Sequence, residues 1–181
     1  FKDQEDINPR WKRAFDQMQS QTKRMNALVN DLLLLSRLEN EKQIAKNQII
    51  EMPNLMNHLF DDAQAYNIDY GHTLNLDIDS HCDLIGSDME MASAFSNLIT
   101  NAIKYTPKGG TITIGWHDDG EQGYFSVEDN GIGIDPKHLP RLTERFYRVD
   151  SARSRATGGT GLGLAIVKHV LMQHGAHIEI D

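Results

Sequence analysis

The chain has 181 residues and a formal net charge of −8 at pH 7, with 39% hydrophobic and 24% charged residues, a composition typical of a globular protein. This acidic balance argues against nucleic-acid binding, which usually requires a basic surface. The single cysteine, Cys82, excludes an intrachain disulfide and fits a reducing compartment. No apolar run approaches the roughly 20 residues that cross a bilayer. The length suits one domain and a smaller element.

Residues 9–40 are predicted to form one long helix, here called the stalk helix. Asn8 is a good N-cap and Pro9 suits the first helical position. A helix of this length measures about 48 Å, which is more than one small domain covers. Apolar residues follow heptad spacing in two rows, and Gln21 interrupts the second. The rows are Trp11, Met18, Met25 and Leu32, and Ala14, Leu28 and Leu35. We expect a dimeric bundle; a domain-capping helix is the simpler alternative.

The rest of the chain is predicted to be a mixed helix and strand domain after a polar linker. The linker is expected at residues 41–48. Turn signals and hydrophobic periodicity then place the elements, and Ser87 with Glu90 suggests a capping box at the start of the central helix. The expected strands are 49–52, 72–78, 111–117, 123–128 and 176–180, and the expected helices are 53–66, 87–105, 136–139 and one that runs from the last glycine cluster to about 174.

The central helix carries a polar group at helical spacing. Asn97, Asn101, Lys104 and Tyr105 are separated by steps of four, three and one. An amide oxygen is a suitable ligand for Mg²⁺, and a lysine one turn further can neutralise phosphate. Asparagines that merely face solvent are the simpler alternative, but Asn is a poor helix former, so two in a helix interior need a reason.

The first glycine cluster is Asp129-Asn-Gly-Ile-Gly-Ile134, directly after a predicted strand. The Asp129 carboxylate can accept a hydrogen bond from the exocyclic amine of adenine, which guanine lacks at that position. Gly131 and Gly133 would let the backbone approach the base. In isolation this sequence is more typical of a tight turn. In combination with the other motifs, however, the first glycine cluster favours an adenine-binding site.

The second glycine cluster, residues 158–164, opens the last helix, and the amides at such a helix start bind phosphate. No Lys-Ser/Thr pair follows it, so it is not a P-loop, and no strand leads into it as in a dinucleotide-binding fold. Five arginines precede it and indicate a lid that meets polyphosphate, although a solvated charged loop is the alternative for Arg153 and Arg155. The candidate binding residues are Gly158, Gly159, Thr160, Gly161, Leu162 and Gly163; the other arginines are Arg141, Arg145 and Arg148.

In their order and spacing these motifs resemble the N box and the two glycine boxes of sensor histidine kinases, and residues 144–150 resemble the F box of that family. Residues 24–39 resemble the second helix of the family's dimerisation and phosphotransfer domain. Residues 145–169 are most similar to the phosphate-regulon sensor kinases. The resemblance implies an α+β fold, an α/β sandwich of the Bergerat type with helices on one face of a mixed sheet. It divides the chain into a partial dimerisation domain (1–40), a linker (41–48) and an ATP-binding catalytic domain (49–181).

The resemblance also implies a role for each site residue. Asn101 would bind Mg²⁺, Asp129 would read adenine and Lys104 would meet phosphate. Tyr105 would line the nucleotide pocket, and Arg148 would contact the γ-phosphate end. The implied reaction transfers the γ-phosphoryl group of ATP to a histidine, and then to an aspartate of a response regulator.

Two departures from the family pattern qualify these expectations. None of the eight histidines lies in the family's acceptor motif, and the family's final strand has no counterpart before residue 181. We therefore expect this fragment not to phosphorylate itself. The expected partners are a second copy through the stalk helix and a response regulator near residues 11–21. The fragment is expected to be soluble and cytoplasmic, with membrane anchorage of the parent protein only through a preceding region.

Three other functions compete with the kinase. Hydrolytic ATPases of the same superfamily, such as gyrase, place a water-activating glutamate where this chain has Asn97. An amide has no useful basicity, so Asn97, with Lys104 and Arg148, makes up the expected catalytic set of a kinase. A degenerate domain that only senses nucleotide is the second alternative. A structural bundle is the third, and it leaves the glycine boxes unexplained.

Overall fold

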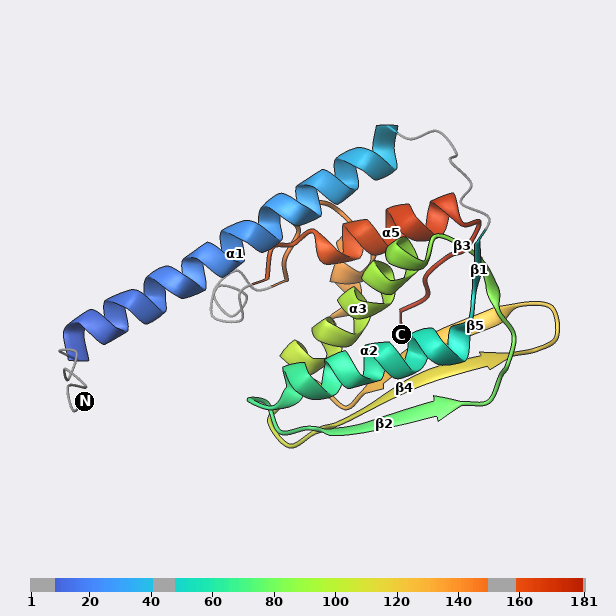
Figure 1. The fold of residues 1–181 in the computed structure, drawn as a ribbon, viewed down its shortest axis with the longest axis horizontal. Helices are drawn as coiled ribbons and strands as arrows, with labels where there is room; N and C mark the ends of the chain where they lie inside the picture. Colours follow the sequence, from blue (N-terminus) through green and yellow to red (C-terminus); the bar gives the residue numbers. More distant parts are fainter. Residues whose placement is uncertain (1–8, 41–47, 150–158, 181) are drawn as a thin grey trace, which may run out of the picture.

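The computed structural model describes residues 9–40, 48–149 and 159–180. Figure 1 shows a long helix, α1, beside a compact domain in which helices cover a sheet. The elements in chain order are α1 (Pro9–Asn40), β1 (Gln48–Ile50), α2 (Met52–Asn67), β2 (Thr73–Ile78), β3 (Leu84–Gly86), α3 (Asp88–Tyr105), β4 (Thr111–Asp118), β5 (Gly123–Asp129), the 3-10 helix η1 (Pro136–Arg141) and α5 (Gly163–Gln173).

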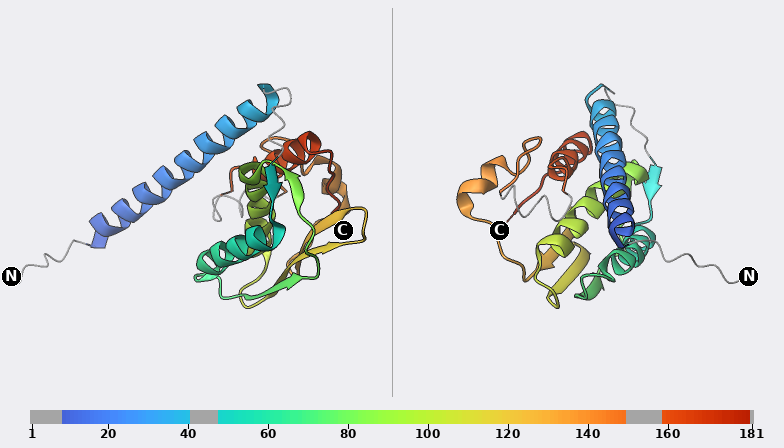
Figure 2. Two further views of the ribbon diagram at one scale, coloured as in Figure 1. Left: turned by 45° about the vertical axis from the view of Figure 1, so that its right-hand side comes forward. Right: turned by 90° about the vertical axis from the view of Figure 1, so that its left-hand side faces the viewer.

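The main sheet has the order β2-β4-β5 and mixes the two kinds of pairing. β2 runs parallel to β4, with Thr73 opposite Thr111, and β5 runs antiparallel to β4, with Asp129 opposite Ile112. The helices lie on one face of this sheet (Figures 1 and 2). Along β4, the buried Ile112, Ile114 and Trp116 point to the helical layer with the period of two that a half-buried strand requires. The predicted α+β sandwich is confirmed.

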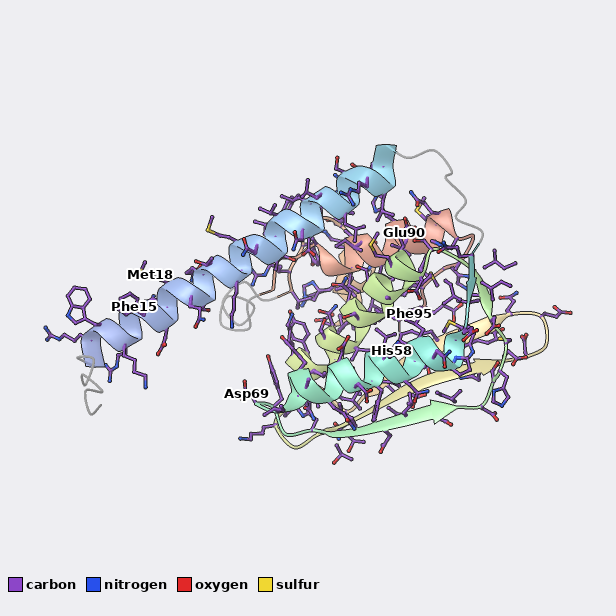
Figure 3. All side chains as sticks on the ribbon, in the orientation of Figure 1. Phe15, Met18, His58, Asp69, Glu90 and Phe95 are labelled. Carbon is purple, nitrogen blue, oxygen red and sulfur yellow. The ribbon has the colours of Figure 1, made fainter. Side chains whose placement is uncertain are left out.

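The core lies between the sheet and helix α3. Phe95 of α3 stacks on Phe125 of β5 with ring centroids 3.9 Å apart (Figure 3). Ile99 and Ile103 continue the buried face of α3, and α5 packs against the same helix through Val167. Because α3 touches the sheet, α2 and α5, its remaining polar face is fixed in position.

Helix α1 has the predicted bounds, and only its C-terminal end packs on the domain. Leu35 and Leu38 are 2% and 6% exposed and join the core beside α5, whereas Trp11 and Met18 are each 64% exposed. Figure 3 shows Phe15 and Met18 on the half of α1 that projects beyond the domain. The first heptad row is therefore uncovered in one copy of the chain, and the predicted dimer stays a prediction.

Three local expectations were wrong. Residues 176–180 form no strand. Four of them instead line an apolar groove of about 380 Å³ with Leu139 of η1 and Leu171 of α5, namely Ala176, His177, Ile178 and Ile180. The short strand β3, which pairs antiparallel with β1, was not predicted, and Gln48, expected in the linker, begins β1. The capping box is absent: the Ser87 side chain makes no capping hydrogen bond.

The start of α3 is held by a distant residue instead. The Ser87 N–H donates to Nε2 of His174, 3.1 Å away, and Oε2 of Glu90 lies 3.9 Å from the same nitrogen. A Cβ on Gly86 would overlap the His174 ring, so glycine is required for this approach. The His174 ring therefore occupies the place that a capping glutamate would take.

Among the helices of residues 9–40, 48–149 and 159–180, none combines the length and the apolar character that a membrane span requires.

Candidate nucleotide-binding site

The polar face of α3 is neither fully exposed to solvent nor buried in the core. Asn97, Asn101, Lys104 and Tyr105 are all half-buried, because the apolar residues between them pack on the sheet and on α5. The helical period of 3.6 places them along one side of the helix. α3 therefore presents a row of polar groups at the boundary of the domain, as the sequence predicted.

Asn97 and Asn101 differ in what their amides contact. Nδ2 of Asn97 donates to the carbonyl oxygen of Ser93 at 2.9 Å, and a Cβ on Gly163 would overlap Oδ1 of Asn97. The Asn101 side chain makes no hydrogen bond with any other described residue. Its amide oxygen, unbonded to any described residue, is a neutral ligand of the kind that Mg²⁺ accepts alongside water and phosphate oxygens. Asn97 thus sits at the α3–α5 contact, whereas Asn101 is available to a ligand.

The first glycine cluster folds against the end of α3. Oδ1 of Asp129 accepts from the Gly131 N–H at 2.8 Å and from Oγ1 of Thr106 at 3.4 Å. The Ile132 N–H donates to the carbonyl oxygen of Tyr105 at 3.4 Å. A Cβ on Gly131 would lie 3.0 Å from that same oxygen, so the close approach requires glycine. These contacts bring Asp129 and Tyr105 together, and Asp129 stays exposed enough to meet a base.

The second glycine cluster packs against the F-box segment. The Phe146 N–H donates to the carbonyl oxygen of Gly161 at 2.8 Å, and a Cβ on Gly161, whose φ is +76°, would lie 2.9 Å from the Phe146 backbone. Phe146 itself adopts a left-handed φ of 62°, a strained conformation that persists only where neighbouring contacts enforce it. The predicted site residue Gly158 lies outside the described residues, as do Arg153 and Arg155.

Arg148, two residues further, carries a charge that no described residue balances. Its Nε and one terminal nitrogen are buried, and neither has a hydrogen-bond partner among the residues that the structure describes. Burying an unpaired guanidinium is costly, so such a group indicates a missing anion. In contrast, Arg141 pairs with Glu144 at 3.1 Å and lies 4.2 Å from the Tyr147 ring centre. Of these two arginines, only Arg148 has buried guanidinium nitrogens without a hydrogen-bond partner among the described residues.

Lys104 is half-buried between helices. Burial lowers its pKa below the usual range, and the carboxylate of Asp31 opposes that shift. Burial likewise raises the pKa of Asp31, against the hydrogen bond from Thr160 and the charge of Lys104. The Lys104 ammonium also lies 5.9 Å from the centre of the Tyr66 ring. A lysine that is partly desolvated and only partly neutralised is suited to meet a polyphosphate.

Sequence reasoning missed Asp31 and Thr106. Asp31 lies on the same helical face as Leu28 and Leu35, three residues after one and four before the other. A charged residue on the face that packs was a signal that this face meets polar groups. For Thr106, directly after the helix, no comparable signal exists.

A family model described as histidine kinase-, DNA gyrase B- and HSP90-like ATPase matches residues 86–181, which include all of these polar and glycine-rich segments. The chain belongs to this ATPase family. ATP is accordingly the nucleotide for which the domain is built. The model of the His Kinase A phospho-acceptor domain matches residues 2–41, a stretch that contains no histidine.

Individual relatives of this ATPase domain agree with that assignment. The phosphate regulon sensor protein PhoR of Pseudomonas aeruginosa is 54% identical over 177 residues, covering 98% of this chain, and that of Haemophilus influenzae is 44% identical, covering 96%. The chain spans 40% of the length of each. In fold, the Acinetobacter baumannii histidine kinase AdeS matches 96% of this chain and 76% of its own, with a TM-score of 0.71 at 21% identity. The resemblance to sensor histidine kinases is confirmed.

Proposed function

We propose that this chain is the ATP-binding catalytic region of a sensor histidine kinase that acts in phosphate-starvation signalling. It transfers the γ-phosphoryl group of ATP to a histidine supplied from outside this chain, for onward transfer to a response-regulator aspartate. The observation that carries the proposal is the guanidinium of Arg148, two of whose nitrogens are buried without a hydrogen-bond partner among the described residues. Arg148 lies two residues from the contact between Phe146 and the second glycine cluster. Such an arrangement favours an anion that enters beside α5.

The adenine would lie at the end of β5. Asp129 has one carboxylate oxygen held by Gly131 and Thr106, and this fixes the other for the exocyclic amine of the base. Tyr105 would form part of the pocket wall, and Gly131 and Gly133 would keep the loop clear of side chains. The base is therefore recognised by a carboxylate that is oriented before binding.

The phosphates would extend toward the start of α5. Lys104 and Arg148 would neutralise their charge, and the amides of residues 159–163 would donate to them, because a helix N-terminus favours anions. The free amide oxygen of Asn101 fits a Mg²⁺ ligand. When bound, Mg²⁺ would supply charge neutralisation of the phosphate oxygens.

The identity of residue 97 favours transfer over hydrolysis. The Asn97 amide is tied to the Ser93 carbonyl and to the contact with Gly163, and it has no basicity with which to activate water. An ATPase of the same superfamily remains the alternative activity, and a module that only senses adenine nucleotide is the non-catalytic one.

The proposed partners follow from the exposed apolar row of α1. The exposed row of Trp11, Met18 and Met25 suits a second copy of the stalk helix, giving a homodimer. We place response-regulator docking near residues 11–21 of the same helix. The proposed division is a partial dimerisation domain (1–40), a linker that ends where β1 begins at Gln48, and an ATP-binding domain from β1 onward. The parent protein is proposed to be anchored in the cytoplasmic membrane with this region in the cytoplasm.

A phosphotransfer assay tests the proposal. The chain is incubated with γ-labelled ATP and Mg²⁺, alone and with a separately supplied helical hairpin that carries the acceptor histidine. Acid-labile, base-stable label on the hairpin is the expected result. Rapid release of inorganic phosphate by the chain alone would favour the ATPase, and nucleotide binding without either product would favour the sensing module.

A further inference from the structure

The stalk helix contacts the second glycine cluster directly. Oγ1 of Thr160 donates to Oδ2 of Asp31 at 2.9 Å and accepts from the Leu162 N–H at 3.2 Å. The one proton of the Thr160 hydroxyl is therefore committed to a carboxylate from α1. A phosphate oxygen at the same place would need that proton.

The charge of the same carboxylate also acts on Lys104. The charge of Asp31 is the one that opposes the desolvation of this lysine, and Lys104 in turn opposes the desolvation of Asp31. Asp31, Lys104 and Thr160 thus form one cluster that joins α1, α3 and the segment before α5. Two of its three members are predicted phosphate ligands.

The position of Asp31 is fixed by the packing that follows it along α1. Leu35 and Leu38 are buried in the core, and the carbonyl oxygen of Leu38 accepts a hydrogen bond from the Gln173 side chain. Glu39 forms an ion pair with Arg145 of the F box. Asp31 is held at the phosphate end of the site by a packed helix and is not a freely moving surface acid.

We propose that Asp31 is a positioning residue of the nucleotide site: it holds the Thr160 hydroxyl through a hydrogen bond, and it competes with the nucleotide phosphates for Thr160 and for the charge of Lys104. The inference rests on the proposed function, because it assumes that phosphate enters beside α5. A carboxylate and a phosphate are both anions, so they cannot share these two groups without like-charge repulsion. By thermodynamic linkage, the position of the stalk helix then sets the phosphate affinity, and bound phosphate loosens the stalk contact.

Calorimetry with ADP and with adenosine, both in the presence of Mg²⁺, separates this role from a structural one. In Asp31→Asn, we expect ADP to bind about three- to tenfold more tightly than in the wild type, the size of a partly buried charge interaction. Adenosine has no phosphate and should bind both proteins equally. Asp31→Glu keeps the charge and should bind ADP like the wild type. Asp16→Asn removes an exposed acid from the same helix and is the matched control.

The outcomes are distinct. Unchanged or weaker ADP binding by Asp31→Asn, with adenosine unchanged, would overturn the competition. Loss of both ligands in this variant would show that Asp31 only supports the fold, and overturn it as well. Absence of ADP and adenosine binding by the wild type would overturn the proposed function itself, and this inference with it.

Discussion

The two ends of the candidate site are built differently. The adenine end joins α3 and β5, which approach each other through contacts of Asp129 and Gly131 with Tyr105 and Thr106. The phosphate end draws on α1, α3, the F-box segment and the start of α5. The first is part of the packed domain, whereas the second depends on where the stalk helix lies. We therefore expect base recognition to be constant and phosphate binding to be the step that the position of the stalk helix changes.

The largest expected effect is at the adenine end. Asp129→Asn should weaken ADP binding about 100-fold or more, because the amide presents a donor or a weaker acceptor where a charged acceptor is needed. Calorimetry measures the affinity, and circular dichroism shows that the fold is intact. Glu128→Gln changes the neighbouring exposed acid, on the other face of β5, and should bind normally. Wild-type affinity in Asp129→Asn would remove this residue from the site.

The next effect tests the contact between α3 and the second glycine cluster. Gly163→Ala places a Cβ against the Asn97 amide and should reduce the free energy of unfolding by about 1–3 kcal/mol. Gly159→Ala lies in the same cluster, where an added Cβ has no described neighbour within 4 Å, and should leave stability unchanged. Urea unfolding followed by circular dichroism measures both. Equal free energies of unfolding for the two variants would show that the Asn97 side chain can move aside without loss of stability.

The third prediction concerns the unpaired cation. Arg148→Gln should weaken ATP binding about tenfold and ADP binding much less, because the guanidinium is assigned to the γ-phosphate end. Arg141→Gln removes a guanidinium that is already paired with Glu144, and both nucleotides should bind it normally. Calorimetry with a non-hydrolysable ATP analogue and with ADP gives the two affinities. An equal loss of both in Arg148→Gln would place this residue elsewhere in the site.

The smallest effect is the pH dependence of stability at the phosphate end. Burial raises the pKa of Asp31 above 3.8, so the folded chain keeps this proton to a higher pH than the unfolded chain does. The associated stability is complete below pH 3.8 and is lost as pH rises through the raised pKa.

The hydrogen bond from Thr160 and the positive charge of Lys104 limit this loss. Relative to the wild type, Asp31→Asn should therefore become more stable as pH rises from about 4 to about 7. Urea unfolding at several pH values measures the difference. A difference that does not change with pH, as expected for Asp16→Asn, would contradict the raised pKa.

Much of the fold followed from local pattern. The stalk helix begins and ends where the N-cap signal and the heptad rows place it, and β4 and β5 lie within one residue of their predicted bounds. Periodicity of 3.6 or 2 is set by the geometry of the helix and the strand, so it can be seen in a single segment. The glycine clusters were likewise recognisable as sites of close approach, and the Cβ contacts at Gly131, Gly161 and Gly163 agree.

The sequence by itself determined most of the helices and strands, the family and the residue types of an adenine-nucleotide site. Only the tertiary structure decided which distant groups meet: His174 takes the place of the expected capping glutamate, and Asp31 reaches Thr160 across 129 residues of chain. Residues 176–180 alternate like a strand yet lie beside η1 and α5. Local periodicity shows that a face will be buried but not against what, because the partner is chosen by the packing of the whole chain.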